Sequence, residues 1–161
     1  MHPHAELIQE FYAAFARRDA DAMVACYHRD VAFSDPAFGA LDATHTRGMW
    51  RMLCGRAKDL VVESSGIEAD ATRGRAHWEA HYTFAVTGRK VHNVIDATFE
   101  FTEGKISRHD DVFDMWRWTK MALGIPGVLL GWTPILRGAV RRKANAQLAS
   151  YLVSHPEAGQ A

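Results

Sequence analysis

Asp35 is a residue whose type and position could support catalysis. It follows the short apolar segment Val31–Ser34 and precedes Pro36. A carboxylate that faces an apolar cavity has its charged form disfavoured, which raises its pKa towards values useful for a general base. An aspartate before proline can equally satisfy the amides of a turn. We interpret Asp35 as a candidate catalytic residue and keep the turn role as the alternative.

His109 and Asp111 form a second candidate, a His-x-Asp pair near the end of a predicted strand. Burial of an imidazole and a carboxylate is costly unless the two groups pair, so an inward placement would need a reason such as catalysis or a polar ligand group. Both faces of this segment mix polar and apolar residues, so the sequence leaves its facing open. A buried His–Asp pair with a purely structural role is the alternative.

Helices at the beginning and end of the chain are predicted by apolar residues at helical spacing. Asp19 is the expected cap of a short second helix that runs through Tyr27, and Thr46 is the expected cap of a third. Thr133–Pro134 indicates the start of a last helix. The apolar stripes of the first, third and last helices are Leu7, Ile8, Phe11 and Phe15; Met49, Trp50, Leu53 and Ala57; and Leu136, Val140, Ala144, Leu148 and Leu152.

Between these helices the apolar period changes to two, which is typical of strands with one covered and one solvated face. Segments 76–86 and 91–101 alternate in this way, and turns at 87–89 and 103–105 join them to each other and to a strand from Ile106 to about Trp118. Leu60–Asp70 supplies another strand. Three helices followed by a curved antiparallel meander predict an α+β fold.

The order of these elements resembles the NTF2-like superfamily, the cone-shaped fold of steroid Δ-isomerases, limonene-epoxide hydrolases and SnoaL-type polyketide cyclases. The resemblance runs from about Glu6 to Asp114 and is carried by segments 11–21, 30–36, 87–90, 99–106 and 111–114. It implies a curved sheet around a pocket, covered by three N-terminal helices. We therefore expect an NTF2-like domain over residues 1–118 and a C-terminal helical extension over 119–161, packed on the same domain.

The resemblance also implies where the site residues lie. Asp35 is at the position of the isomerases' proton-shuttling aspartate, and the family register turns His109 and Asp111 towards the pocket. SnoaL-type cyclases use an acid from the same strand region. Apolar side chains on the covered face would either line this pocket or fill a core. The expected substrate-binding residues are Phe11, Trp50, Trp78, Tyr82, Asn93, Phe99 and Phe113.

Two of the three catalytic groups of the steroid isomerases are absent. Their first-helix tyrosine would fall at Phe11, and Tyr12 lies about 100° round the helix. Their second acid would fall at Ala97, whereas Asp96 points to the opposite face. The epoxide-hydrolase pattern keeps Asp111, but its Arg-x-Asp pair would fall at Trp78 and Ala80. Neither reaction is expected in its usual form.

Composition limits the remaining function classes. The 161 residues are 48% hydrophobic and 24% charged with zero formal net charge, as expected of one globular domain without a nucleic-acid partner. Cys26 and Cys54 lie in apolar helical patterns and are expected to be reduced core thiols. The first residues lack the layout of a secretory signal, so we expect a cytoplasmic protein.

Charge is distributed unevenly along the chain. Residues 1–114 carry 13 Lys and Arg against 18 Asp and Glu, whereas residues 115–156 carry six basic and no acidic residues. Docking of the basic segment on the acidic body is one interpretation, and contact with anionic lipid is the other. On the predicted outer sheet face, His77, Glu79, His81 and His92 could bind a metal adventitiously, but they suit a solvated face or a dimer contact better. We predict no metal site and no cofactor.

The function predicted first is cofactor-free acid–base chemistry of the isomerase, cyclase or hydrolase type on a small hydrophobic carbonyl or polyketide-like compound. Asp35 would move the proton, while His109 and Asp111 would relay or stabilise charge. The alternatives are a non-catalytic module that binds the same small apolar molecule, and a dimerisation or membrane-associated module that acts through the C-terminal segment. A homodimer is the expected assembly.

Overall fold

The computed structural model describes residues 1–161 as one α+β unit. Its elements are α1 (Pro3–Ala16), α2 (Ala20–Ala25), β1 (Tyr27–Asp35), β2 (Gly39–Leu41), α3 (Ala43–Arg56), β3 (Val61–Ala69), β4 (Arg73–Phe84), β5 (Arg89–Thr102), β6 (Lys105–Val112), α4 (Met115–Leu123), α5 (Ile125–Leu130), α6 (Pro134–Ser154) and the 3₁₀ helix η1 (Pro156–Gly159). No helix combines the length and hydrophobicity that a membrane span requires.

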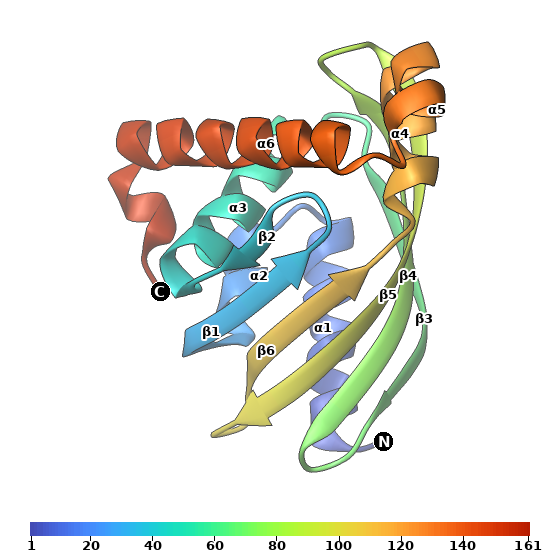
Figure 1. Cartoon of the computed structure of the whole chain (residues 1–161). Coiled ribbons are helices and arrows are strands. Elements are labelled where there is room, and N and C mark those ends of the chain that lie inside the picture. Colours follow the sequence, from blue (N-terminus) through green and yellow to red (C-terminus); the bar gives the residue numbers. More distant parts are fainter.

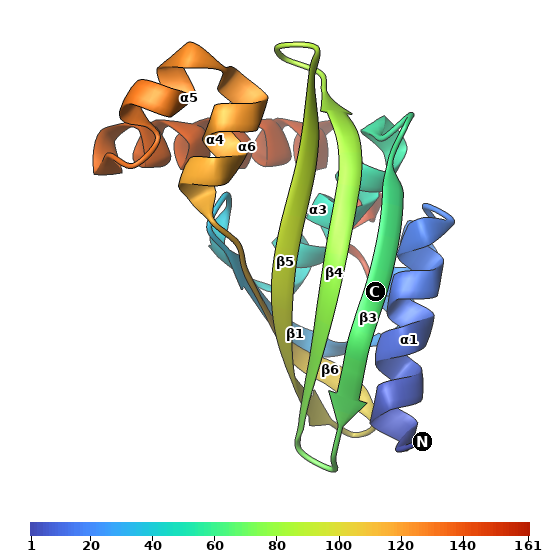
Figure 2. The same ribbon diagram turned by 90° about the vertical axis from the view of Figure 1, so that its right-hand side faces the viewer.

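The six strands form one curved sheet in the order β2-β1-β6-β5-β4-β3. Helices α1, α2 and α3 lie on its concave side, and α6 runs across α3 and β2 (Figure 1). The outer face of β3, β4 and β5 carries no helix (Figure 2). The predicted α+β architecture with three N-terminal helices is therefore confirmed. The sheet is not antiparallel throughout, because β1 pairs with β6 in the parallel direction.

The hydrophobic core lies between the concave face and the helices. Six of the residues predicted to face inward on β4 and β5 are buried in it: Ala76, Trp78, Ala80, Ile95, Ala97 and Phe99. Tyr82 and Phe84 are half-buried, whereas Val86, predicted on the same face, lies beyond the end of β4 and is exposed. The outward neighbours His77, Glu79 and Asp96 stay at least partly exposed. Strict alternation in two paired strands leaves only one way to bury this set, so the sequence pattern predicted the inner face correctly.

The predicted helix caps are confirmed at two of three positions. Asp19 accepts from the N–H of Ala22, and Thr133 accepts from the N–H of Leu136. The third helix begins earlier than predicted, because Asp42 accepts from the N–H of His45 and caps α3. Thr46 lies inside that helix and donates to the carbonyl of Asp42.

Two further predicted boundaries are wrong. The strand expected to reach Trp118 ends at Val112, because Asp114 accepts from the N–H of Arg117 and begins α4. An aspartate cap changes the backbone from extended to helical within one residue. Tyr27, which was expected at the end of a helix, is instead the first residue of β1. Its side chain is thereby turned into the core, where it takes part in the site described below.

The C-terminal extension is joined to the sheet through α4. Met115, Trp118 and Ala122 pack on Val91, and the indole N–H of Trp118 donates to the Tyr82 hydroxyl over 2.8 Å. Helix α6 turns its predicted apolar stripe inward, with Leu148 fully buried. The extension therefore covers one end of the sheet and contacts the N-terminal helices through α3.

Candidate functional site

A chain of hydrogen bonds crosses the interior from α3 to β6. The indole N–H of Trp50 donates to the Tyr27 hydroxyl over 2.8 Å, and this hydroxyl lies 2.8 Å from Nδ1 of His109. Tyr27 has no third partner, so its own proton must point at Nδ1. The proton of the neutral imidazole is then on Nε2. We assign His109 to this tautomer from the network.

Nε2 of His109 donates to Oδ1 of Asp111 over 2.9 Å. The same oxygen accepts the indole N–H of Trp78 over 3.3 Å. Both side chains of the His–Asp pair are almost completely buried, with exposed fractions of 0% and 3%. Two side chains from different strands thus hold this oxygen of Asp111 in place. The predicted inward facing of His109 and Asp111 is therefore present, and the two groups pair with each other.

Asp35 lies beside Asp111 on the neighbouring strand. Ser34 pairs with Asp110 in the parallel β1–β6 ladder, so the next residue of each strand points to the inner face. Burial raises the pKa of Asp35 to about 6, the N–H of Phe38 opposes the rise, and the negative charge of Asp111 adds to it. A carboxyl group with this pKa can exchange a proton near neutral pH.

The turn role considered for Asp35 is also present. Its Oδ1 accepts from the N–H of Phe38 over 2.6 Å. The N–H of Ala37 also favours the charged form of this carboxylate. Nearby, burial raises the pKa of Tyr82, the Trp118 hydrogen bond opposes this, and the charge of Asp35 adds to the rise. Tyr82 and Asp35 thus lie within electrostatic range of each other, where α4 meets the sheet.

Tyr12 of α1 contributes an unpaired polar atom. Its hydroxyl is the buried side-chain oxygen that lacks a hydrogen-bond partner. Burial raises the pKa of Tyr12 well above its ordinary value, and the charge of Asp111 raises it further. A buried hydroxyl without an acceptor is uncommon, because the lost hydrogen bond to water is not replaced. This atom is suited to donate to an oxygen bound beside Asp111.

The other predicted binding residues divide into two groups. Phe11, Trp50 and Phe99 surround the His109 ring at centroid distances of 5.4, 6.1 and 4.5 Å. Asn93 is buried on the same face and makes no side-chain hydrogen bond. Tyr82 and Phe113 are half-buried. The two principal surface hollows, one beside α2 and α3 and one beside Arg73 and Arg108, include neither Asp35 nor the His–Asp pair.

A family model described as the SnoaL-like domain matches residues 8–109 of the chain. The chain belongs to the SnoaL-like family. The match covers the elements from α1 to His109 and leaves α4, α5 and α6 outside it. Membership confirms the predicted NTF2-like resemblance, and with it the cone-shaped arrangement of sheet and helices. No protein with a curated description matches the sequence.

Solved structures share the fold of this SnoaL-like protein. A proposed polyketide cyclase from Xanthomonas campestris pv. campestris is 21% identical with a TM-score of 0.62, over 74% of this chain and 96% of its own. An LEH-like epoxide hydrolase from M. tuberculosis is 20% identical with a TM-score of 0.62, over 83% and 95%. IdmH from Streptomyces antibioticus, also a proposed polyketide cyclase, is 16% identical with a TM-score of 0.61, over 73% and 96%. At these identities the similarity shows the fold alone.

Two residues of the SnoaL-like site were missed in the sequence. Tyr12 lies four residues after Ile8 and three before Phe15, and that spacing places it on the buried side of α1 with Phe11. The signal was therefore available. Tyr27 was hidden because its segment was assigned to a helix. The structure also pairs Asp111 directly with Ala97, so a carboxylate lies on the strand next to the position where the isomerase acid would fall.

Proposed function

We propose that this SnoaL-like protein catalyses cofactor-free acid–base chemistry on a small hydrophobic carbonyl or polyketide-like compound. The observation that carries the proposal is the placement of Asp35 beside the Asp111–His109 pair on the inner face. Asp35, with a pKa of about 6, is the base that removes a proton from carbon next to the carbonyl. The charge of Asp111 beside it favours the protonated form of Asp35, which then returns the proton to the substrate before the product is released.

Developing charge on the carbonyl oxygen requires a donor. The unpaired hydroxyl of Tyr12 lies within electrostatic range of Asp111 and supplies this donor in our proposal. The aromatic rings around His109 provide an apolar surface for a flat compound. Asp35, Tyr82 and Phe113 keep partial exposure. They are the entry side of the proposed site, next to α4.

Exchange of substrate protons tests the proposal. The intact protein is incubated in D₂O with a panel of small aromatic ketones and polyketide-like compounds, and deuterium at the α-carbon is followed by mass spectrometry. We expect exchange whose rate rises through about pH 6, since only ionised Asp35 accepts a proton. Asp35→Asn should abolish it. Asp30→Asn, an exposed carboxylate of the same strand, is the matched control.

A panel member that binds without exchange would favour the non-catalytic alternative, a module that only holds a small apolar molecule. Exchange that continues in Asp35→Asn would refute Asp35 as the base. Failure of all compounds to bind, judged by native mass spectrometry, would count against both the substrate class and the proposed inner-face site.

A second function is favoured by one specific surface, which we call the apolar-basic surface. It consists of exposed large apolar residues of α4, α5, the following turn and the first turn of α6, together with basic residues of α6. Ile125 and Ile135 are 75% and 83% exposed. The members are Trp116, Ile125, Val128, Leu129, Leu130, Trp132, Ile135, Arg137, Arg141, Arg142 and Lys143.

We propose that the apolar-basic surface binds an anionic lipid surface. None of its four basic residues forms an ion pair within the chain. Exposed apolar groups of this size seldom remain in water without a partner. Tryptophan and leucine beside unpaired arginine and lysine match the two parts of an anionic membrane interface, its acyl boundary and its headgroup charge.

Vesicle co-sedimentation tests this second proposal. We expect the protein to pellet with phosphatidylcholine vesicles that contain phosphatidylglycerol, and far less with phosphatidylcholine alone. Leu129→Ser and Arg142→Glu should each reduce the pelleted fraction, whereas Val153→Ser, an exposed apolar residue near the end of α6, should not. A dimer in light scattering that Leu129→Ser dissociates, with no pelleting, would instead make this surface a contact between two copies of the chain.

A further inference from the structure

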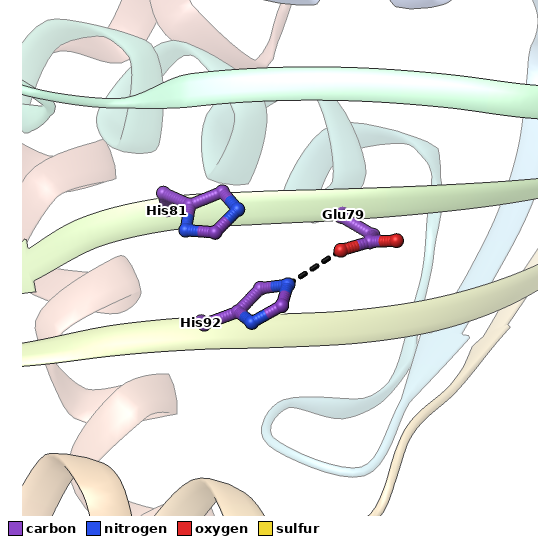
Figure 3. Close-up of side chains that lie close together, drawn as sticks. All are labelled: Glu79, His81 and His92. Carbon is purple, nitrogen blue, oxygen red and sulfur yellow. Dashed lines mark hydrogen bonds and ion pairs between the residues drawn. The ribbon is translucent and has the colours of Figure 1, made fainter.

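The outer face of β4 and β5 carries a cluster of metal-ligating side chains that the proposed functions do not use. His81 pairs directly with His92 across the two strands, and Glu79 lies two residues before His81 on the same face. One ligand atom from each of the three lies within 4.8 Å of the others. Figure 3 shows the two imidazoles and the carboxylate grouped above neighbouring strands.

We propose that Glu79, His81 and His92 form a binding site for Zn²⁺ or a similar borderline divalent cation. Two imidazoles and one carboxylate are a ligand set that zinc accepts. Mg²⁺ and Ca²⁺ prefer oxygen ligands and are not expected here. The position is open to solvent, so water or an external group would complete the coordination.

The ligands need only a small rearrangement to bind a metal. Tetrahedral zinc with bonds of about 2.0–2.1 Å requires donor atoms about 3.4 Å apart. Nε2 of His92 lies 2.5 Å from Oε2 of Glu79, so these two atoms must move slightly apart to bind the same ion. The rings of His81 and His92 are stacked, with centroids 4.0 Å apart and an angle of 13° between their planes. His81 is exposed, so rotation of its side chain can turn a ring nitrogen towards the other two ligands without moving the strands.

A neighbouring pair holds the carboxylate in place. Nε2 of His77 lies 3.5 Å from Oε1 of Glu79, the oxygen that does not contact His92. Nδ1 of His77 lies 2.9 Å from Oδ1 of Asp96 on β5. His77 is therefore a positioning residue, which orients Glu79 through its free oxygen. Outer partners of this kind fix the orientation of ligands in metal sites.

Calorimetric titration of the chelator-treated full chain with zinc chloride tests the site. We expect saturable binding of one Zn²⁺ per chain in the micromolar range, together with a zinc-dependent rise in melting temperature. His81→Ala and His92→Ala should each abolish both effects. His77→Ala should weaken binding about tenfold and leave one site per chain.

Two controls separate this site from other histidines. The double variant His2→Ala/His4→Ala removes the N-terminal pair, and His45→Ala removes a partly exposed histidine of α3; both should bind zinc as the unchanged protein does. Equal zinc binding by the His81→Ala and unchanged proteins would overturn the proposal, as would no saturable binding in the micromolar range. The four side chains would then form only an ion-pair network on a solvated sheet face.

Discussion

Asp35 and Asp111 occupy neighbouring positions on the two parallel strands of the sheet, and both carboxylates face its inner side. Their environments differ. Asp111 accepts N–H hydrogen bonds from two side chains, His109 and Trp78, whereas Asp35 accepts from backbone N–H groups of its own turn. Burial and the charge of Asp111 raise the pKa of Asp35 to about 6, so Asp35 is the carboxyl group that can exchange a proton near neutral pH. This asymmetry makes Asp35 the proton carrier in the proposed chemistry.

Asp35→Asn should change stability in a pH-dependent way. The pKa of Asp35 in the folded chain, about 6, exceeds its ordinary value of 3.8. The protonated carboxyl group of Asp35 therefore stabilises the folded chain fully below pH 3.8, and this contribution is lost as the pH rises through about 6. Asparagine does not titrate. The free energy of unfolding of Asp35→Asn, relative to that of the unchanged protein, should therefore rise by up to about 3 kcal/mol from acidic to neutral pH. Urea unfolding on both sides of this range measures the difference. A difference independent of pH would refute the raised pKa.

Tyr27→Phe should destabilise the protein by about 2–4 kcal/mol, because it leaves both the Trp50 indole N–H and His109 Nδ1 without a partner. Tyr12→Phe is the matched change at a tyrosine that makes no hydrogen bond. It should cost nothing or stabilise slightly, since it removes a buried unpaired hydroxyl. Denaturant unfolding of the two variants under one condition measures the contrast. Equal losses would contradict the network.

The tautomer of His109 is directly observable. Nitrogen-15 chemical shifts should show a protonated Nε2 and an unprotonated Nδ1 in the unchanged protein at neutral pH. In Tyr27→Phe the donor to Nδ1 is gone, and the Nδ1 signal should move while Nε2 stays bonded to Asp111. A proton on Nδ1 in the unchanged protein would show that the chain of donors runs in the opposite direction.

Gly127→Ala should separate α5 from α4. A Cβ atom at Gly127 would lie 1.9 Å from the carbonyl oxygen of Thr119, and backbone cannot move aside as a flexible side chain can. We expect a loss of about 1–3 kcal/mol. Gly55→Ala, in α3 with nothing within 4 Å of the added atom, is the control and should be neutral or stabilising by up to about 1 kcal/mol. Thermal unfolding compares the two, and a neutral Gly127→Ala would mean that the α4–α5 contact is loose.

Much of the fold follows from patterns that are local in the sequence. The alternation over 76–84 and 91–99 determined which side chains enter the core, because a strand can bury only one of its faces. Asp19 and Thr133 began helices as expected, because a cap needs only amides of the following turn. The strand that contains Asp111 was predicted to reach about Trp118 but ends at Val112. Asp114 caps α4, so the apolar residues that follow it are helical.

The sequence by itself determined the α+β class, the SnoaL-like family and the inner set of β4 and β5, because helical spacing, alternation and family motifs are written along the chain. Only the tertiary structure decided that Asp111 faces Ala97, that Tyr27 bonds His109 and that Tyr12 has no partner. These relations depend on the register between strands and on the distance of α1 and α3 from the sheet. Tyr27 and His109, for example, lie 82 positions apart, and no local pattern in the sequence records their contact.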